Sequence, residues 1–119
     1  MKKKILLVED DLLACRAYQK RLINEGYDVD CAIDGEDGFA KSYNGYDCII
    51  LDIMLPKLDG WQVLERVKGD DRIKNTPIIV FTVLDGDHHR KNAAELGAHG
   101  FVNKHKDDLI STIKKILSS

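Results

Sequence analysis

Five short apolar runs recur along the chain at nearly even intervals, and this repetition strongly constrains the fold. The runs occupy residues 5–8, 29–32, 48–51, 78–81 and, more weakly, 101–102. The first, third and fourth are continuous rather than alternating, a pattern typical of parallel strands that are covered on both faces.

Segments of helical length and period separate these runs, at residues 12–24, 36–43, 60–68, 87–96 and 107–117. In the first of them, Cys15, Tyr18 and Leu22 share one stripe, and Gly26 follows where a helix C-cap belongs. Strands that alternate with helices indicate a parallel sheet with right-handed crossovers and helices on both faces. We therefore predict an α/β fold, a single doubly wound sandwich with a five-stranded parallel sheet.

The chain length allows one hydrophobic core. For 119 residues and 13.4 kDa, surface scaling predicts roughly 6,500 Å² of folded surface against about 19,000 Å² unfolded. We expect one domain over residues 1–119, without a linker and without room for a second domain.

Charge and apolar content exclude several classes of protein. The 18 basic and 20 acidic residues give a net charge of -2, so no basic excess indicates direct binding to nucleic acid. The apolar run behind the basic N-terminus is too short for a signal peptide or a membrane span. The chain has an odd number of cysteines, and Cys15, Cys31 and Cys48 are widely spaced. This favours the interpretation that they are small buried hydrophobic residues in a reducing compartment. We expect a soluble cytoplasmic protein with no membrane partner.

Polar residues follow four of the predicted strands. They are Glu9, Asp10 and Asp11 after the first, Asp52 after the third, Thr82 at the end of the fourth, and Asn103 and Lys104 at the end of the fifth. In an open α/β sheet, ligands bind beyond the carboxyl ends of the strands. We therefore expect these side chains to converge on one edge of the sheet as a strongly acidic pocket.

Clustered carboxylates repel one another unless a cation lies between them. Carboxylate oxygens at a site with few ligands suit Mg²⁺ better than Ca²⁺, and the absence of His and Cys disfavours zinc. Lys104 could either neutralise the carboxylates or hold a phosphoryl oxygen. A metal, a lysine, a threonine hydroxyl and a nucleophilic carboxylate together are what phosphoryl transfer to an aspartate needs.

These residues carry a family resemblance. Residues 5–11 (ILLVEDD), residues 51–56 (LDIMLP) with Asp59 and Gly60, the Phe81-Thr82 pair and Lys104 resemble the receiver domain of two-component response regulators, the CheY-like superfamily. The resemblance covers essentially the whole chain. It implies a flavodoxin-like (βα)5 fold with strand order 2-1-3-4-5. It also implies a signalling switch rather than an enzyme, since such a domain catalyses only its own aspartyl phosphorylation and dephosphorylation.

The resemblance also implies a role for each site residue. Asp52 would be the phosphoacceptor for a sensor histidine kinase or a phosphotransfer protein. Glu9, Asp10, Asp52 and the backbone carbonyl of Met54 would bind Mg²⁺, Lys104 would pair with the phosphate, and Thr82 and Phe101 would act as switch residues. The face of the fourth helix, fifth strand and fifth helix would pass the signal to a downstream protein target or output domain, and would also be where two copies pair as a homodimer.

Three positions depart from the usual pattern of the family. His105 follows Lys104 where a proline, often with a cis peptide, is usual. A non-proline cis bond costs roughly 2.5–4 kcal/mol, so the bond is either trans or strained. Val83 stands where a small residue is usual, and its branched side chain would narrow access to Asp52. Phe101 replaces the usual tyrosine, so that any inward swing of its ring would depend on packing alone.

Simpler interpretations exist for single residues. Asp11 is expected to be a helix N-cap, Thr82 alone could be an ordinary strand residue, and Lys104 alone could be a solvated amine. His88 and His89 are adjacent, so we expect their rings to point in different directions and to make a poor metal pair.

Other functions fit the residues less well. A haloacid-dehalogenase-like phosphatase would need an acid/base aspartate where Met54 stands, together with a cap domain. A flavodoxin-like flavin binder would need a phosphate-binding loop where Glu9, Asp10 and Asp11 would repel the phosphate. A receiver-like module that binds partners without phosphorylation is the alternative that Val83 and His105 leave open. Whether the domain acts alone or belongs to a longer protein is also open.

Overall fold

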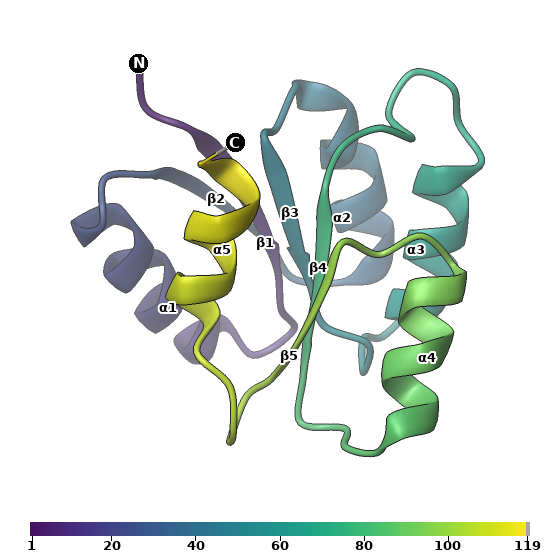
Figure 1. Cartoon of the computed structure of the whole chain (residues 1–119). Helices are drawn as coiled ribbons and strands as arrows, with labels where there is room; N and C mark the ends of the chain where they lie inside the picture. The colour runs from purple at the N-terminus through teal and green to yellow at the C-terminus, as the bar shows by residue number, and fades with distance from the viewer. Residues whose placement is uncertain (119) are drawn as a thin grey trace.

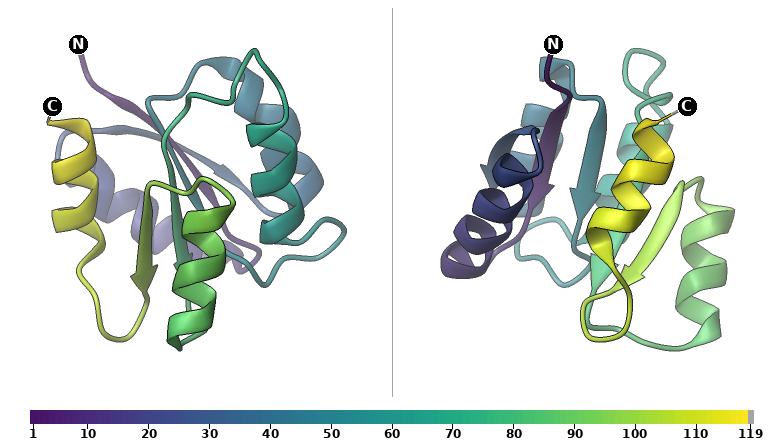
Figure 2. Two further views of the ribbon diagram at one scale, coloured as in Figure 1. Left: turned by 45° about the vertical axis from the view of Figure 1, so that its right-hand side comes forward. Right: turned by 60° about the vertical axis from the view of Figure 1, so that its left-hand side comes forward.

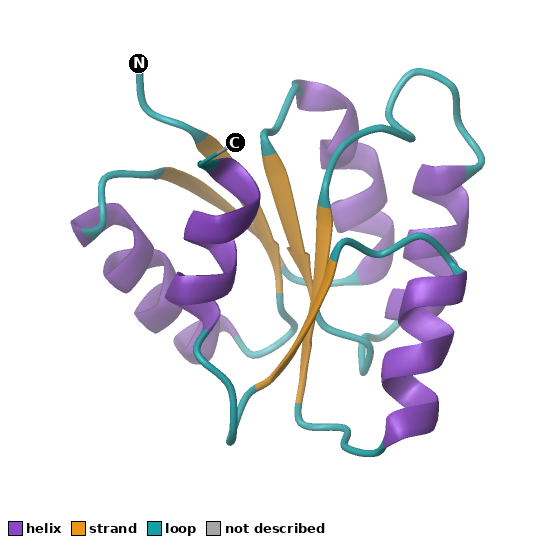
Figure 3. Cartoon of the chain, viewed as in Figure 1, coloured by secondary structure: helices purple, strands orange, loops and turns teal. Residues whose placement is uncertain are grey.

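The computed structural model describes residues 1–118, in which a parallel sheet lies between two layers of helices (Figures 1 and 3). The elements in chain order are β1 (Lys4–Val8), α1 (Leu12–Asn24), β2 (Asp28–Ala32), α2 (Gly35–Lys41), the 3₁₀ turn η1 (Ser42–Asn44), β3 (Cys48–Leu51), α3 (Gly60–Lys68), β4 (Ile78–Thr82), α4 (Asp87–Glu95), β5 (Gly100–Asn103) and α5 (Leu109–Leu117).

The strands run in the order β2-β1-β3-β4-β5, and all neighbouring pairs are parallel. This confirms the predicted α/β class and strand order. The order reverses direction between β1 and β3, where Val8 lies opposite Leu51 in register. The residues that follow these two strands, Glu9 and Asp52, are therefore brought to the same edge of the sheet.

Each face of the sheet buries its own hydrophobic cluster. One cluster contains Leu6 and Val8 of β1 with Val63 and Leu64 of α3, and the other contains Ile5 and Leu7 of β1 with residues of α1 and α5. Figure 2 shows α1 and α5 on one side of the sheet and α2, α3 and α4 on the other. Because both faces are covered, the central strands are apolar over residues 5–8, 48–51 and 78–81, as their continuous runs predicted. The accessible surface of 6426 Å² is close to the expected value.

Side-chain caps set two helix starts. Asp11 caps α1 through hydrogen bonds from the backbone N–H groups of Leu13 and Ala14, as the sequence predicted. The last helix begins at Leu109 rather than at residue 107, because Asp108 caps it and is not part of it. The second helix was expected over residues 36–43, but α2 ends at Lys41 and continues as the 3₁₀ turn η1.

No helix within residues 1–118 has the length and hydrophobicity of a membrane-spanning segment. Cys15, Cys31 and Cys48 are free thiols, and two of them are buried as small apolar groups while Cys31 is half-buried.

Gly60 fixes the start of α3 against the backbone of Asp52, and its substitution tests this contact. A Cβ at position 60 would lie 2.2 Å from the Asp52 carbonyl oxygen. We expect Gly60→Ala to lower the free energy of unfolding by about 1–3 kcal/mol, measured by urea denaturation, because backbone must move to make room. Gly69→Ala is the control, since its φ is -84° and a Cβ there would lie 3.2 Å from the nearest atom. Equal losses in the two variants would contradict this account.

Candidate functional site

Three carboxylates gather where β1 and β3 end, at the edge of the sheet predicted from the sequence. Glu9, Asp10 and Asp52 each place an oxygen so that all three oxygens lie within 4.8 Å of one another. Glu9 and Asp52 are buried, whereas Asp10 is exposed. The cluster is therefore anchored in the protein and open to solvent on one side.

Lys104 provides the positive charge of this cluster. Its Nζ lies 2.6 Å from Oε2 of Glu9 and 2.9 Å from Oδ2 of Asp52. The side chains of this ion-paired group are 12% exposed for Lys104, 4% for Glu9 and 8% for Asp52. Lys104 is thus a largely buried partner of the carboxylates and not the solvated amine of the simpler interpretation.

The pKa values of Glu9 and Lys104 reflect burial and pairing together. Burial raises the pKa of Glu9 above its ordinary value of 4.5, the hydrogen bond from Lys104 opposes this increase, and the neighbouring Asp52 carboxylate adds to it. Burial alone would lower the pKa of Lys104, but its hydrogen bonds to Glu9 and Asp52 outweigh burial and the pKa is raised. Lys104 therefore carries its charge throughout the physiological range.

The donor set fits a hard divalent cation. Glu9, Asp10 and Asp52 supply only oxygen atoms, which suits Mg²⁺. Two carboxylates with one lysine between them leave an excess of negative charge, and Asp10 adds to it at the open side. A cation at this position would offset that repulsion.

Asp52 is held on both of its carboxylate oxygens. Oδ1 accepts a hydrogen bond from the backbone N–H of Met54 at 3.2 Å, and Oδ2 accepts the bond from Lys104. Met54 itself is 56% exposed. The role of the Met54 carbonyl as a metal ligand remains a prediction.

The two predicted switch residues lie on neighbouring strands. Thr82, at the end of β4, is fully buried, and its Oγ1 accepts a hydrogen bond from the Leu84 backbone N–H at 3.3 Å. Phe101 on β5 is half-buried, and the Arg90 guanidinium lies 4.8 Å from the centre of its ring. Arg90 also donates to the Phe101 carbonyl, so α4 holds this ring from the outside.

The unusual residues of the sequence have defined places. None of the peptide bonds in the part of the chain that the structure describes is cis, so the Lys104–His105 bond is trans and Lys104 still reaches Asp52. Val83 is 45% exposed in the loop after β4. Its predicted effect on access to Asp52 stays a prediction.

Phe81 and Asn103 support the site, and the sequence placed both beside it without indicating what either contacts. The Lys104 ammonium lies 5.2 Å from the centre of the Phe81 ring, and Tyr18 packs edge-on against the same ring. The Asn103 side chain forms hydrogen bonds to both neighbouring loops. Its position immediately before Lys104 was the only signal of this in the sequence.

The expectation that the rings of His88 and His89 point in different directions was wrong. The ring centres of His88 and His89 lie 3.9 Å apart, and the His89 ring stacks on Trp61 of α3. His88 and His89 follow Asp87 in the first turn of α4. Among the described residues, the only candidate metal cluster found is that of Glu9, Asp10 and Asp52.

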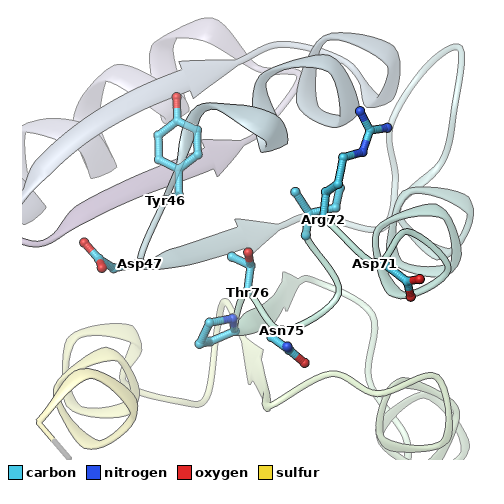
Figure 4. Close-up of a pocket in the computed structure, with 8 residues that line it drawn as sticks. Tyr46, Asp47, Asp71, Arg72, Asn75 and Thr76 are labelled. Carbon is cyan, nitrogen blue, oxygen red and sulfur yellow. The ribbon is translucent and has the colours of Figure 1, made fainter.

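A pocket of about 330 Å³ lies at the opposite end of the sheet, before β3 and β4 (Figure 4). Four of its polar side chains, those of Tyr46, Asp47, Asp71 and Arg72, are already paired with the protein. The Tyr46 hydroxyl donates to Asp30, and Arg72 forms an ion pair with Asp70. This pocket shares no residue with the acidic cluster and does not contribute to the site.

Comparison with known proteins gives a consistent result. The family model described as the response regulator receiver domain matches residues 5–114. The chain is 39% identical over 114 residues to the transcriptional regulatory protein DltR of Streptococcus agalactiae. The matched region covers 93% of this chain and 50% of that protein. It is 33% identical over 121 residues to the probable transcriptional regulator ycf29 of Porphyra purpurea, with 98% and 57% covered. The chain thus spans about half the length of these curated relatives.

Solved structures agree in fold over almost the whole chain. The chemotaxis response regulator CheY4 of Vibrio cholerae superimposes with a TM-score of 0.90 at 27% identity, covering 98% of this chain and 100% of that one. The receiver domain of sensor histidine kinase PA1611 from Pseudomonas aeruginosa has a TM-score of 0.86 at 27% identity, with both chains fully covered. That structure contains a magnesium ion coordinated in its active site cleft.

The raised pKa of Glu9 predicts a pH dependence of stability in the absence of metal. Because the folded state keeps the Glu9 proton to a higher pH than the unfolded state, ionising Glu9 above its folded pKa costs stability. We expect Glu9→Gln to gain stability relative to the wild type as the pH rises from 4.5 toward neutrality, measured by urea denaturation with a chelator.

The exposed Glu36 at the start of α2 provides the matched control. The stability difference between Glu36→Gln and the wild type should change less over the same range. A difference for Glu9→Gln that stays constant or reverses with pH would contradict the assigned burial of the Glu9 charge.

Proposed function

The chain belongs to the response regulator receiver domain family, and from this premise we propose that it is a signalling switch that accepts a phosphoryl group on Asp52. The donor would be a sensor histidine kinase or a phosphotransfer protein. The observation that carries the proposal is the pairing of a buried aspartate with Lys104 beside two further carboxylates.

The proposed reaction is an in-line transfer. An Asp52 carboxylate oxygen attacks the phosphorus of a phosphohistidine, a new O–P bond forms, and the P–N bond breaks with its electron pair leaving on the imidazole nitrogen. Lys104, already 2.9 Å from Asp52, would pair with the transferred phosphoryl oxygens. The Thr82 hydroxyl would donate a hydrogen bond to one of them.

Glu9, Asp10 and Asp52, with the Met54 carbonyl, would hold Mg²⁺. When bound, the ion supplies the positive charge that offsets the carboxylates and the phosphoryl group. The buried Glu9 fixes one side of this donor set, and the exposed Asp10 leaves the other side accessible to solvent.

The phosphorylated state would be read by protein contacts. We propose that Thr82 and Phe101 transmit the change to the face of α4, β5 and α5, which would bind a downstream target, an output domain or a second copy of the chain. DltR and ycf29, which the chain matches over about half their length, are named as transcriptional regulators. An output of that kind is a proposal for this chain.

The direct test is intact-mass analysis after incubation with Mg²⁺ and acetyl phosphate. We expect the wild type to gain the mass of one phosphoryl group. The Asp52→Asn variant should gain none, because the asparagine side-chain amide is not a nucleophile at neutral pH. Asp59→Asn is a matched control, since Asp59 caps α3 and should leave labelling intact. Labelling of Asp52→Asn would refute Asp52 as the acceptor. No labelling of the wild type, even by a cognate kinase, would favour the binding module that acts without phosphorylation.

Val83 should limit access of small donors to Asp52. We expect Val83→Ala to be phosphorylated by acetyl phosphate several times faster than the wild type, by roughly two- to tenfold, because two methyl groups leave the loop after β4. The measurement is the initial rate of adduct formation at saturating Mg²⁺. Unchanged rates would show that the side chain does not obstruct the site.

A further inference from the structure

We propose that Asn103 is a positioning residue for the phosphoryl-transfer site, because its side-chain amide joins the loop after β4 to the loop after β5. The first loop follows Thr82 and the second begins with Lys104. This inference rests on the proposed function and adds to it the group that keeps these two residues at a fixed separation.

The amide uses both of its ends. Nδ2 donates to the carbonyl of Leu84 at 3.1 Å and to that of Val83 at 3.5 Å, both in the loop after β4. Oδ1 accepts the backbone N–H of His105 at 2.9 Å, in the loop after β5. The side chain is buried, with Asn103 only 1% exposed. A buried amide with both ends bonded holds two loops in one arrangement.

The strand register places this link beside the reacting groups. Asn103 lies opposite Thr82 in the pairing of β4 with β5, and the Lys104 N–H donates to the Thr82 carbonyl at 2.9 Å. The loop that follows Thr82 and the loop that begins with Lys104 therefore start side by side. Beyond that point, the hydrogen bonds of the Asn103 amide to both loops fix the distance between them.

Other contacts between the two loops are exposed and weaker. Lys106 and Asp85 form an ion pair whose side chains are 64% and 50% exposed. Arg90, which lies in α4 rather than in the loop before it, forms an ion pair with Asp107 at 41% and 35% exposure. Solvent and salt screen such pairs, so each contributes little. The buried amide is the link that solvent does not compete for.

The backbone of residue 105 takes part in the link between the two loops. The Asn103 Oδ1 has its partner only because residue 105 carries a backbone N–H, which a proline would lack. The trans peptide between Lys104 and His105 directs that N–H toward Asn103. The imidazole of His105 plays no part in this bond.

The test compares Asn103→Leu with the wild type. Leucine has a similar volume and no hydrogen-bonding group, so it frees both loops without opening a large cavity. We expect the His105 amide to exchange with solvent about tenfold faster, measured by hydrogen-exchange NMR. We expect the rate of Asp52 phosphorylation by acetyl phosphate at saturating Mg²⁺ to fall about tenfold, because Lys104 and Thr82 are no longer held in place.

Mg²⁺ affinity distinguishes positioning from a general loss of structure. Glu9, Asp10 and Asp52 follow β1 and β3, so the Mg²⁺ dissociation constant from NMR titration should stay within about twofold of the wild type. His105→Ala is the control, because it keeps the N–H and should match the wild type in all three measurements. If Asn103→Leu does not fold, Asn103→Ala is used in the same way, since it admits water to the freed groups.

The outcomes are distinct. A wild-type rate in the Asn103 variant would overturn this inference alone, whatever happens to the thermal midpoint. A parallel loss of Mg²⁺ affinity and rate would also overturn it, since that indicates collapse of the whole site. A wild type that takes up no phosphoryl group would refute the proposed function, and this inference with it.

Discussion

The ion pairs of Lys104 with Glu9 and Asp52 are the interaction on which the rest of the site depends. Three charged side chains from distant parts of the sequence meet where each is 12% exposed or less. Buried charges are costly unless they are paired and hydrogen-bonded, and here one ammonium serves two carboxylates. The site therefore carries unbalanced negative charge when no cation is bound. This imbalance makes the site receptive to a divalent cation, which would offset the carboxylates.

The order of the strands determines how Lys104 reaches Glu9 and Asp52. β1 and β3 are neighbours, but β4 separates β3 from β5. Lys104 must therefore extend across the end of β4 to reach Asp52, and its ammonium passes 5.2 Å from the ring centre of Phe81. A long, flexible side chain over an aromatic ring meets that requirement. Phe81 packs in turn on Tyr18 of α1, so the position of the lysine depends on the core beneath it.

The strands and the position of the acidic cluster could be predicted from the sequence, and particular residues show the physical reason. Continuous apolar runs report burial on both faces of a strand, so β1, β3 and β4 were evident, and the polar residue after each run was placed at one edge. Hydrogen bonds between side chain and backbone left weaker signals. Asp108 looked like the first turn of a helix and is its cap. The rings of His88 and His89 lie 3.9 Å apart, and the His89 ring stacks on Trp61 of another helix. The role of Asn103 depends on two loops whose approach no local pattern encodes.

The central claim is that this charge arrangement directs phosphorylation to a single carboxylate. Borohydride reduction of the phosphorylated protein converts an aspartyl phosphate to homoserine, which peptide mass spectrometry locates by residue. We expect homoserine at position 52 and at no other position, since Asp52 alone in the cluster bonds to both Lys104 and the Met54 N–H. Reduction at Asp10 or at another aspartate, with Asp52 unchanged, would contradict it.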